Sequence, residues 1–251
     1  MNNKTLHIIG NEFTRHINHT DEWWKNRLNV YEYFCLNSIK QQTNKNFLLL
    51  MSLDWVPSHV CEKIKQILDR SGLKYIIHII KDVSFSEIMK PFVDDFEIIY
   101  HTRIDSDDLF HKNAVEEIQS YDFENRRALV FQKGYCYDIR ENKLRHYFMP
   151  SPPFSTIMYP MNIYIDKQKQ EEYKNFRSHD TLVQKMPYVS LSENKFIVNV
   201  HGTNRITTFE NNRGKYRGYN DDIDIPISEI DNILKPFGIN SNTYNEKVKQ
   251  N

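Results

Sequence analysis

The 251-residue sequence lacks a long apolar run, an excess of either charge, and internal repeats. No stretch approaches the roughly 20 apolar residues that cross a bilayer. The amino-terminal Met-Asn-Asn-Lys leads into only a short apolar run, so we expect no secretory signal. Lys and Arg together number 33, as do Asp and Glu, which gives no global attraction to nucleic acid or anionic membranes. We therefore expect a cytoplasmic protein without a transmembrane segment, which contacts the inner face of the membrane peripherally if its acceptor is lipid-linked.

The three cysteines are Cys35, Cys61 and Cys136, and they lie far apart. They form no Cys-x-x-Cys pair and no Cys/His spacing typical of a zinc site. Cys35 and Cys61 fall within helical patterns and are expected to be small core residues. Hydrophobic residues make up 39% of the chain and charged residues 26%, which suits a globular domain with a real core.

Strand and helix patterns alternate through the first half of the chain. The sequence predicts strands at 5–9, 47–53, 75–80 and 97–102, with helices beginning near residues 20, 57 and 84. The continuous apolar run at 47–53 is typical of a parallel strand buried on both faces. This alternation predicts an α/β fold, a mostly parallel sheet flanked by helices.

The second half has a more varied pattern. Strands are predicted at 127–138, 144–149 and 196–200, the first two joined as a hairpin. We expect an extended piece at 157–165 around Pro160 and a short helix from Ser178. We divide the chain into a domain at 1–209 and an appendage at 210–251. The appendage comprises a polar lid or linker at 210–222, a short amphipathic helix at 227–237 and a frayed end.

The strongest chemical signal is Arg-Ile-Asp-Ser-Asp-Asp at residues 103–108, which follows the apolar strand at 97–102. Clustered carboxylates at a strand end are costly unless a positive group lies beside them. Mg²⁺ and Mn²⁺ take oxygen ligands, often one or two carboxylates plus substrate phosphates. Ligands of open α/β sheets bind at the carboxyl ends of the strands. The pattern therefore predicts a metal–diphosphate site.

Other interpretations of this acidic string remain open. It can form a turn followed by a helix cap, since Asp and Ser favour both. A carboxylate at a strand end can also attack phosphorus, as in phosphatases with an aspartyl nucleophile. An EF-hand loop is excluded, because Leu109 and Phe110 stand where that loop needs an oxygen ligand and a glycine.

The string resembles the DxD motif of glycosyltransferases with the GT-A fold. The wider pattern is similar to family-2 enzymes and most similar to the bacterial putative rhamnosyltransferase family, over roughly residues 5 to 210. Residues 38–43, Ser-Ile-Lys-Gln-Gln-Thr, resemble the segment that precedes the second strand in family-2 enzymes. The resemblance implies a metal-dependent, inverting glycosyltransferase that uses Mn²⁺ or Mg²⁺ and a nucleotide-diphosphate sugar. It also implies a glycan or lipid-linked glycan acceptor in surface polysaccharide or lipopolysaccharide assembly. The rhamnosyl label rests on the resemblance alone.

The resemblance also implies roles for individual residues. Asp107 is expected to coordinate the metal, and Asp105 to hold ribose or sugar hydroxyls, with the metal as its second option. Arg103 would orient these carboxylates or neutralise phosphate; it can also simply form an ion pair with them. His201, which follows the strand at 196–200, corresponds to a late histidine that several GT-A enzymes add to the metal shell.

Three further residues complete the expected site. Asp54 ends the strand at 47–53 and would contact the nucleotide base or ribose, and Arg15 would reach a phosphate from the loop after the first strand. Asp180 is the candidate catalytic base. The family has Glu-Asp or a similar pair there, whereas this chain has His179-Asp180, and capping of its own helix is the alternative role of Asp180.

Two other functions share these features. A metal-dependent nucleotidyltransferase or phosphohydrolase would use the same acidic string but release pyrophosphate or phosphate. A non-catalytic relic of the fold would bind a glycan or nucleotide without turnover.

Overall fold

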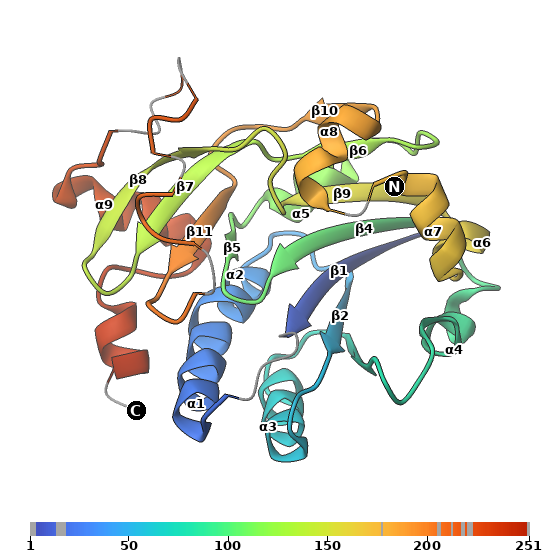
Figure 1. Cartoon of the computed structure of the whole chain (residues 1–251), viewed down its shortest axis with the longest axis horizontal. Coiled ribbons are helices and arrows are strands. Elements are labelled where there is room, and N and C mark those ends of the chain that lie inside the picture. The colour runs from blue at the N-terminus through green and yellow to red at the C-terminus, as the bar shows by residue number, and fades with distance from the viewer. Residues whose placement is uncertain are drawn as a thin grey trace.

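Two β-sheets of unequal size organise the computed structural model of the chain (Figure 1). The structure describes residues 4–13, 19–176, 178–204, 207–211, 213–216, 219 and 223–249. Within these ranges the larger sheet has seven strands in the order β10-β6-β9-β4-β1-β2-β3, and the smaller has four in the order β5-β11-β7-β8. Helices flank the larger sheet, so the predicted α/β fold is confirmed.

The larger sheet is mostly parallel. Its strands are β1 (Thr5–Phe13), β2 (Leu48–Leu53), β3 (Tyr75–Ile79), β4 (Ile98–Asp105), β6 (Ala128–Val130), β9 (Ser155–Pro160) and β10 (Tyr188–Ser190). Only β9 runs antiparallel to its described neighbours, β4 and β6. The smaller sheet consists of β5 (Leu109–Phe110), β7 (Lys133–Asp138), β8 (Lys143–Phe148) and β11 (Phe196–Val200). Here β7 and β8 form the predicted antiparallel hairpin.

One long helix packs against both sheets. α1 (Asp21–Val30) continues through a π-helical segment, η1 (Tyr31–Leu36), into α2 (Asn37–Lys40). Thr20 caps its start by accepting a hydrogen bond from Trp23 N. Leu28 and Tyr31 are buried with strands of the larger sheet, and Val30 and Phe34 with the smaller sheet. This helix therefore ties the two sheets together.

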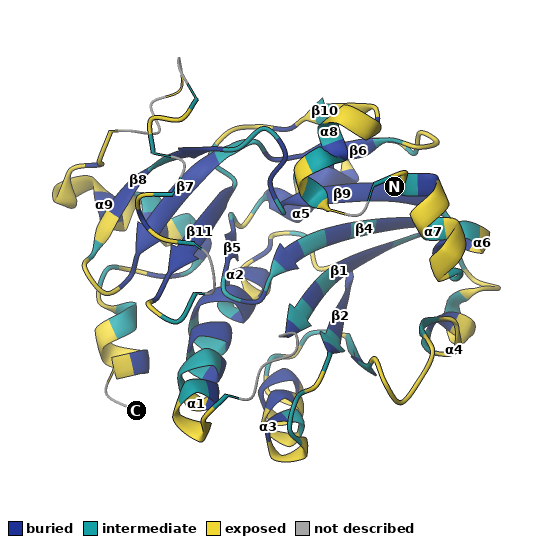
Figure 2. Ribbon diagram, viewed as in Figure 1, coloured by how far each residue is buried: buried dark blue, intermediate teal, exposed yellow. Residues whose placement is uncertain are grey.

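The remaining helices are short. They are α3 (Ser58–Asp69), α4 (Phe85–Met89), η2 (Lys90–Phe92), α5 (Ala114–Gln119), α6 (Met161–Tyr164), α7 (Lys167–Lys174), η3 (His179–Thr181), α8 (Leu182–Lys185), α9 (Ile227–Leu234), η4 (Lys235–Phe237) and η5 (Asn245–Lys249). Figure 2 shows the strands largely buried, with exposed residues gathered on helices such as α7 and α3. Every helix among the described residues is too short or too polar to cross a bilayer.

The strand order reverses at β1, which lies between β2 and β4. The chain runs outward through β2 and β3 and then returns to the other side of β1 as β4. β1 pairs with β4 in parallel, and Glu12 of β1 lies opposite Asp105 of β4. Such a reversal leaves a crevice at the carboxyl ends of the strands, where open α/β sheets bind their ligands. The acidic string lies at this edge.

Two sequence predictions for the second half were wrong. The strand predicted at 127–138 is two strands, β6 in the larger sheet and β7 in the smaller. In β7, Gly134 lies so close to Phe196 that an added Cβ would be 2.5 Å from the Phe196 carbonyl oxygen. The extended piece predicted at 157–165 ends at Pro160, and α6 follows. Pro160 has φ −61° and ψ 142°, and its fixed φ suits the residue at the start of a helix.

The carboxyl-terminal region is more ordered than the sequence predicted. η5 buries Val248, so the described residues up to Lys249 are not frayed. In α9 and η4, Ile230, Leu234 and Phe237 are buried in one cluster with Tyr137 and Leu144 of the smaller sheet. The division at residue 209 stays a prediction.

A chain of buried polar side chains crosses the larger sheet. His7 Nε2 lies 2.7 Å from Thr102 Oγ1, and Thr102 Oγ1 lies 2.6 Å from Thr156 Oγ1. On the other side Gln119 Nε2 lies 3.0 Å from His7 Nδ1 and also donates to Asn46 O. Gln119 therefore donates to Nδ1, and the neutral ring donates from Nε2 to Thr102. Burial, together with the charge of His101, lowers the pKa of His7 to about 3.

This lowered pKa predicts a loss of stability in acid. The unfolded chain takes up a proton at His7 below about pH 6.5, whereas the folded protein does so only near pH 3. Stability from this group is therefore complete above pH 6.5 and falls as the pH drops. At pH 5.0 the loss is about 2 kcal/mol. The free energy of unfolding, measured with urea at pH 7.5 and 5.0, should fall by about 2 kcal/mol less in His7→Gln than in wild type. Equal decreases in the two proteins would contradict the assignment.

Candidate active site

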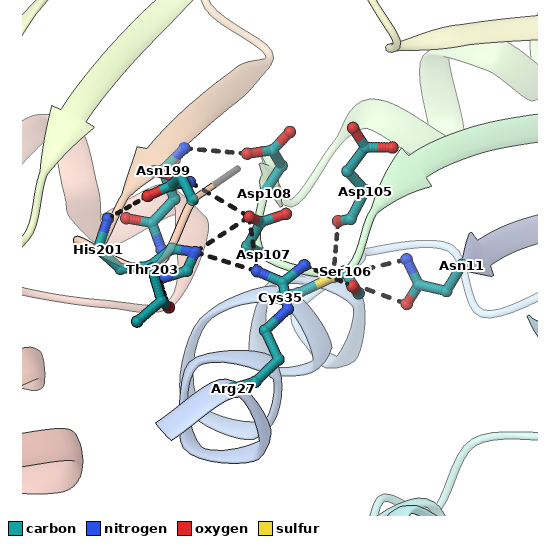
Figure 3. Close-up of polar contacts among 11 residues, drawn as sticks. Asn11, Arg27, Cys35, Asp105, Ser106, Asp107, Asp108, Asn199, His201 and Thr203 are labelled. Atoms are coloured by element: carbon teal, nitrogen blue, oxygen red, sulfur yellow. Dashed lines mark hydrogen bonds and ion pairs between the residues drawn. The ribbon is translucent and has the colours of Figure 1, made fainter. Parts of the chain in front are cut away.

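The acidic string forms a turn between the two sheets. Asp108 N donates to Asp105 O at 3.1 Å, and this turn joins β4 of the larger sheet to β5 of the smaller one. Asp108 is buried, and its Oδ1 accepts a hydrogen bond from Asn199 N of β11 at 3.0 Å. The string thus forms the turn considered from the sequence, but none of its acids caps the next helix, because Asn113 occupies the cap position of α5. The turn thus places the acids where both sheets meet (Figure 3).

The side chains of Arg27 and His201 both contact the Asp107 carboxylate. Arg27 Nη1 donates to Asp107 Oδ2 at 2.7 Å and lies 3.0 Å from His201 Nε2. His201 Nε2 itself lies 3.0 Å from Asp107 Oδ2. Because Arg has only donors, we assign the imidazole proton to Nδ1, which lies 2.8 Å from Thr203 Oγ1. A carboxylate oxygen and an imidazole lone pair therefore face one guanidinium nitrogen.

Arg27 was not singled out from the sequence. It lies one helical turn after Trp24 and one before Tyr31, on the buried side of α1. Its second nitrogen, Nη2, donates to Ser106 Oγ at 2.8 Å, and its guanidinium lies 5.7 Å from the centre of the Phe13 ring. A cation on an otherwise apolar helix face was the available signal, since a buried charge needs a partner.

A tight turn after β11 holds His201 in place. Gly202 has φ +84°, and a Cβ there would lie 2.4 Å from Arg140 Nη1, so this position needs glycine. Asn204 Oδ1 accepts from His201 N at 2.7 Å. Asn204 Nδ2 donates to Asn199 O at 2.8 Å and lies 3.3 Å from Asp107 Oδ2. Asp107 and His201, both expected as metal ligands from the sequence, thus lie in contact; their binding of a metal stays a prediction.

The charges of the turn are unequal. Burial favours the neutral form of Asp107, but the charge of Arg27 and the hydrogen bond that Arg27 donates outweigh burial and hold the pKa of Asp107 below its ordinary value. Burial raises the pKa of Asp108 well above its ordinary value, and the charges of Asp107 and Asp105 add to this. Burial also lowers the pKa of His201. At neutral pH, Asp107 is therefore ionised and His201 is neutral, while the surroundings of Asp108 favour its neutral form.

Asp105 does not join the Asp107–His201 pair. Its carboxylate accepts a hydrogen bond from Arg103 Nη2 at 2.8 Å, and both side chains are about 40% exposed. Figure 3 shows this carboxylate turned away from Asp107. The ion-pair role considered for Arg103 is therefore present, and the partly exposed Asp105 carboxylate lies at the carboxyl end of β4.

Among the described residues, several buried polar atoms have no hydrogen-bond partner. They include Arg27 Nε, Tyr31 Oη, and both Oδ1 and Nδ2 of Asn199. Buried polar atoms in folded proteins nearly always have partners, including water or ligands. Arg27 and Asn199 both contact the turn at 105–108, so polar ligand atoms or water can complete the hydrogen bonding of these two side chains.

The π-helical segment contributes to the same edge. Cys35 is buried within it, and its Sγ lies 3.5 Å from Asp105 O. Asn11 Nδ2 donates to Ile104 O at 2.8 Å, bridging the ends of β1 and β4. π-helical turns inside α-helices are often found at functional sites. Here the segment brings α1 and the strand ends together.

The other predicted residues are more distant from Asp107 or lie outside the described ranges. Asp54 follows β2, and its N–H donates to Phe13 O at 3.5 Å, so it lies at the same edge of the sheet. Trp55 beside it is 62% exposed with φ 58°, an uncommon conformation for an aromatic residue. Arg15 lies outside the described residues.

Asp180 lies at the start of η3, with 62% of its side chain exposed. It is not the cap: Ser178 caps by accepting from Asp180 N. The Asp180 carboxylate accepts from Ser178 Oγ at 3.0 Å and lies 3.3 Å from His179 Nδ1. Within the described ranges no hydrogen bond or ion pair links it to the turn at 105–108.

Comparison with known proteins identifies the family. The family described as "Putative rhamnosyl transferase" matches residues 7–212. The chain belongs to this family. Its general activity is therefore of the glycosyltransferase type. No curated protein matches the chain.

Solved structures show only distant similarity. The 1–349 fragment of S. aureus TarS with UDP-GlcNAc has a TM-score of 0.47 and 11% identity, over 98% of this chain and 74% of that one. In the complex of this fragment with UDP, the chain covers 60% of TarS 1–349. Mouse xyloside xylosyltransferase 1 has a TM-score of 0.41 and 11% identity, over 81% of this chain and 99% of that one. A cytidylyltransferase from Leptospira borgpetersenii has a TM-score of 0.39 and 11% identity, over 98% of this chain and 94% of that one. Similarities at this level specify no ligand or substrate for this chain.

The geometry predicts unequal stability effects for the two acids. Asp107→Asn leaves Arg27 as an uncompensated, mostly buried charge, which should reduce the free energy of unfolding by about 3–5 kcal/mol. Asp105→Asn is the matched control, because it breaks a half-exposed pair of the kind that contributes about 0–1 kcal/mol. Chemical denaturation at pH 7 measures both. Equal losses in the two variants would contradict the structural role of the Arg27–Asp107 pair.

Proposed function

We propose that the protein transfers a sugar from a nucleotide-diphosphate donor to a glycan acceptor, with inversion, using Mn²⁺ or Mg²⁺. The supporting observation is the pairing of Asp107 Oδ2 with His201 Nε2, 3.0 Å apart, at the strand-end edge of the sheet. Rhamnose as the sugar, and surface polysaccharide or lipopolysaccharide as the product, rest on the family alone. The proposed acceptor is a glycan, free or lipid-linked.

The spacing of the two candidate ligand atoms, Asp107 Oδ2 and His201 Nε2, fits a hard divalent ion. Ligand atoms at about 2.1 Å from an octahedral ion and at right angles to each other are about 3.0 Å apart. Within the described ranges no three His, Cys, Asp or Glu side chains form a metal-holding group. A two-residue set is nevertheless usual for Mg²⁺, which completes its shell with water and substrate phosphates. Asp107 and His201 would hold the ion, which would neutralise the leaving diphosphate.

The remaining residues hold the donor. Asp105, with Arg103 beside it, lies at the carboxyl end of β4 and suits ribose or sugar hydroxyls. Asp54 lies at the end of β2 and suits the base or ribose; the exposed ring of Trp55 offers a face on which a base can stack. Arg15 stays a candidate for the phosphates. These residues position the donor without taking part in proton transfer.

Asp180 is the proposed base that takes the acceptor hydroxyl proton. Its exposed carboxylate is oriented by Ser178 and His179 and is not used as a helix cap. An acceptor that approaches from solvent can therefore reach it. A closing segment at 210–222 stays part of the proposal. Of its cations, Arg213 pairs with Asp224 at 2.8 Å, while Arg217, like Arg205 before the segment, lies outside the described residues.

Turnover of a panel of nucleotide-diphosphate sugars with Mn²⁺ tests the reaction class. We expect release of free nucleoside diphosphate, with transfer to free or lipid-linked glycans. Release of pyrophosphate instead would indicate a nucleotidyltransferase, and binding without turnover would indicate a relic of the fold.

Asp180→Asn should keep donor affinity and lower the transfer rate on the order of 10²-fold or more, because it removes a base and no donor contact. Asp94→Asn is the matched control. Asp94 is an exposed carboxylate just before the amino end of β4, whereas Asp105 is at the carboxyl end of that strand. Initial rates and nucleotide affinity are measured for both variants. A near-normal rate in Asp180→Asn would remove this residue from the mechanism.

A further inference from the structure

Arg27 holds the space that a metal ion would need. Its Nη1 lies 2.7 Å from Asp107 Oδ2 and 3.0 Å from His201 Nε2, so it is close to both proposed ligand atoms at once. The imidazole nitrogen has a single lone pair, which faces this guanidinium in the assigned tautomer. An ion bound to the same two atoms on that side would overlap Nη1. The guanidinium and the ion are therefore alternatives.

We propose that Arg27 is a resident cation of the donor-free protein and that a divalent ion enters only when Arg27 withdraws. The inference rests on the proposed function, since it concerns the same metal site. Arg27 thereby makes the free protein a weak binder of divalent ions. It also links metal entry to the arrival of the donor.

The charges support this exchange. Arg27 compensates Asp107, and Arg103 compensates Asp105, so the turn needs no added cation before a ligand arrives. A diphosphate offers the displaced guanidinium a new anionic partner, and Arg binds phosphate oxygens with two parallel hydrogen bonds. The ion can then take the place of Arg27 at Asp107.

The present position of Arg27 is also incompletely satisfied. Its Nε is buried and has no hydrogen-bond partner among the described residues, although Nη1 and Nη2 are both used. Its side chain is 13% exposed. A second position in which phosphate or water accepts from Nε would satisfy this donor.

Mn²⁺ binding to the donor-free protein tests the proposal without any activity measurement. Electron paramagnetic resonance reports free Mn²⁺ during a titration of wild type, Arg27→Gln and Arg103→Gln. Both variants remove one positive charge near the acids, but of the two arginines only Arg27 contacts both Asp107 and His201. We expect Arg27→Gln to bind Mn²⁺ at least about tenfold more tightly than wild type, and Arg103→Gln to change the affinity by less than about threefold.

Arg27→Lys keeps the test valid if Arg27→Gln does not fold. A lysine retains the charge, but its single nitrogen cannot donate to Ser106 and Asp107 through separate groups as a guanidinium does. We expect Arg27→Lys to raise the affinity for Mn²⁺ by about threefold. Thermal unfolding of the variant checks that it is folded. Equal affinities of wild type and the Arg27 variants, or an equal gain in Arg103→Gln, would overturn the proposal.

Addition of UDP separates this proposal from the function it rests on. If wild type binds Mn²⁺ with UDP and the Arg27 variants do not differ from it, only the role of Arg27 is wrong. If no protein binds Mn²⁺ alone or with any of UDP, GDP, CDP, ADP and dTDP, the metal site itself is wrong, and the exchange at Arg27 is overturned with it. Donor turnover, measured separately, still decides the glycosyltransferase reaction.

Discussion

The mostly buried ion pair between Arg27 and Asp107 connects the three parts of the protein that make the site. Arg27 comes from α1, Asp107 from the turn after β4, and the neighbouring His201 from the end of β11. Both side chains of the pair are less than 15% exposed. Removing one partner from such a pair is costly, because the other is left as a buried, unpaired charge. The packing of α1 against both sheets and the geometry of the site therefore depend on the same contact.

The turn at residues 105–108 lies where the chain leaves one sheet and enters the other. Asp105 is the last residue of β4 in the larger sheet, and Leu109 begins β5 in the smaller one. Because β5 pairs with β11, the smaller sheet brings Asn199 and His201 to the acids. The larger sheet brings Asn11 and Glu12 to the same place through the register of β1 with β4. A site at the reversal of strand order is thus completed from a second sheet that packs beside it.

The sequence predicted the features of this site that depend on local pattern. Apolar runs marked the strands, and an acidic string directly after one of them marked the ligand edge. His201 was found because it follows a strand. Arg27 was missed because helical spacing shows which face is buried but not which distant residue that face meets. The split of 127–138 was missed for a similar reason: its residues favour extended structure throughout, and only tertiary pairing assigns β6 and β7 to different sheets.

A cluster of acids at a strand end suggested from the outset that positive charge must lie nearby. The folded chain supplies that charge itself: Arg103 pairs with Asp105, Arg27 pairs with Asp107, and burial favours the neutral form of Asp108. Folding therefore needs no metal ion to balance the acids. In the proposed reaction a bound diphosphate changes this balance, because it adds negative charge to a turn whose two arginines only match Asp105 and Asp107. A divalent cation would then be needed only when the donor binds, which separates the requirements of the fold from those of the proposed reaction.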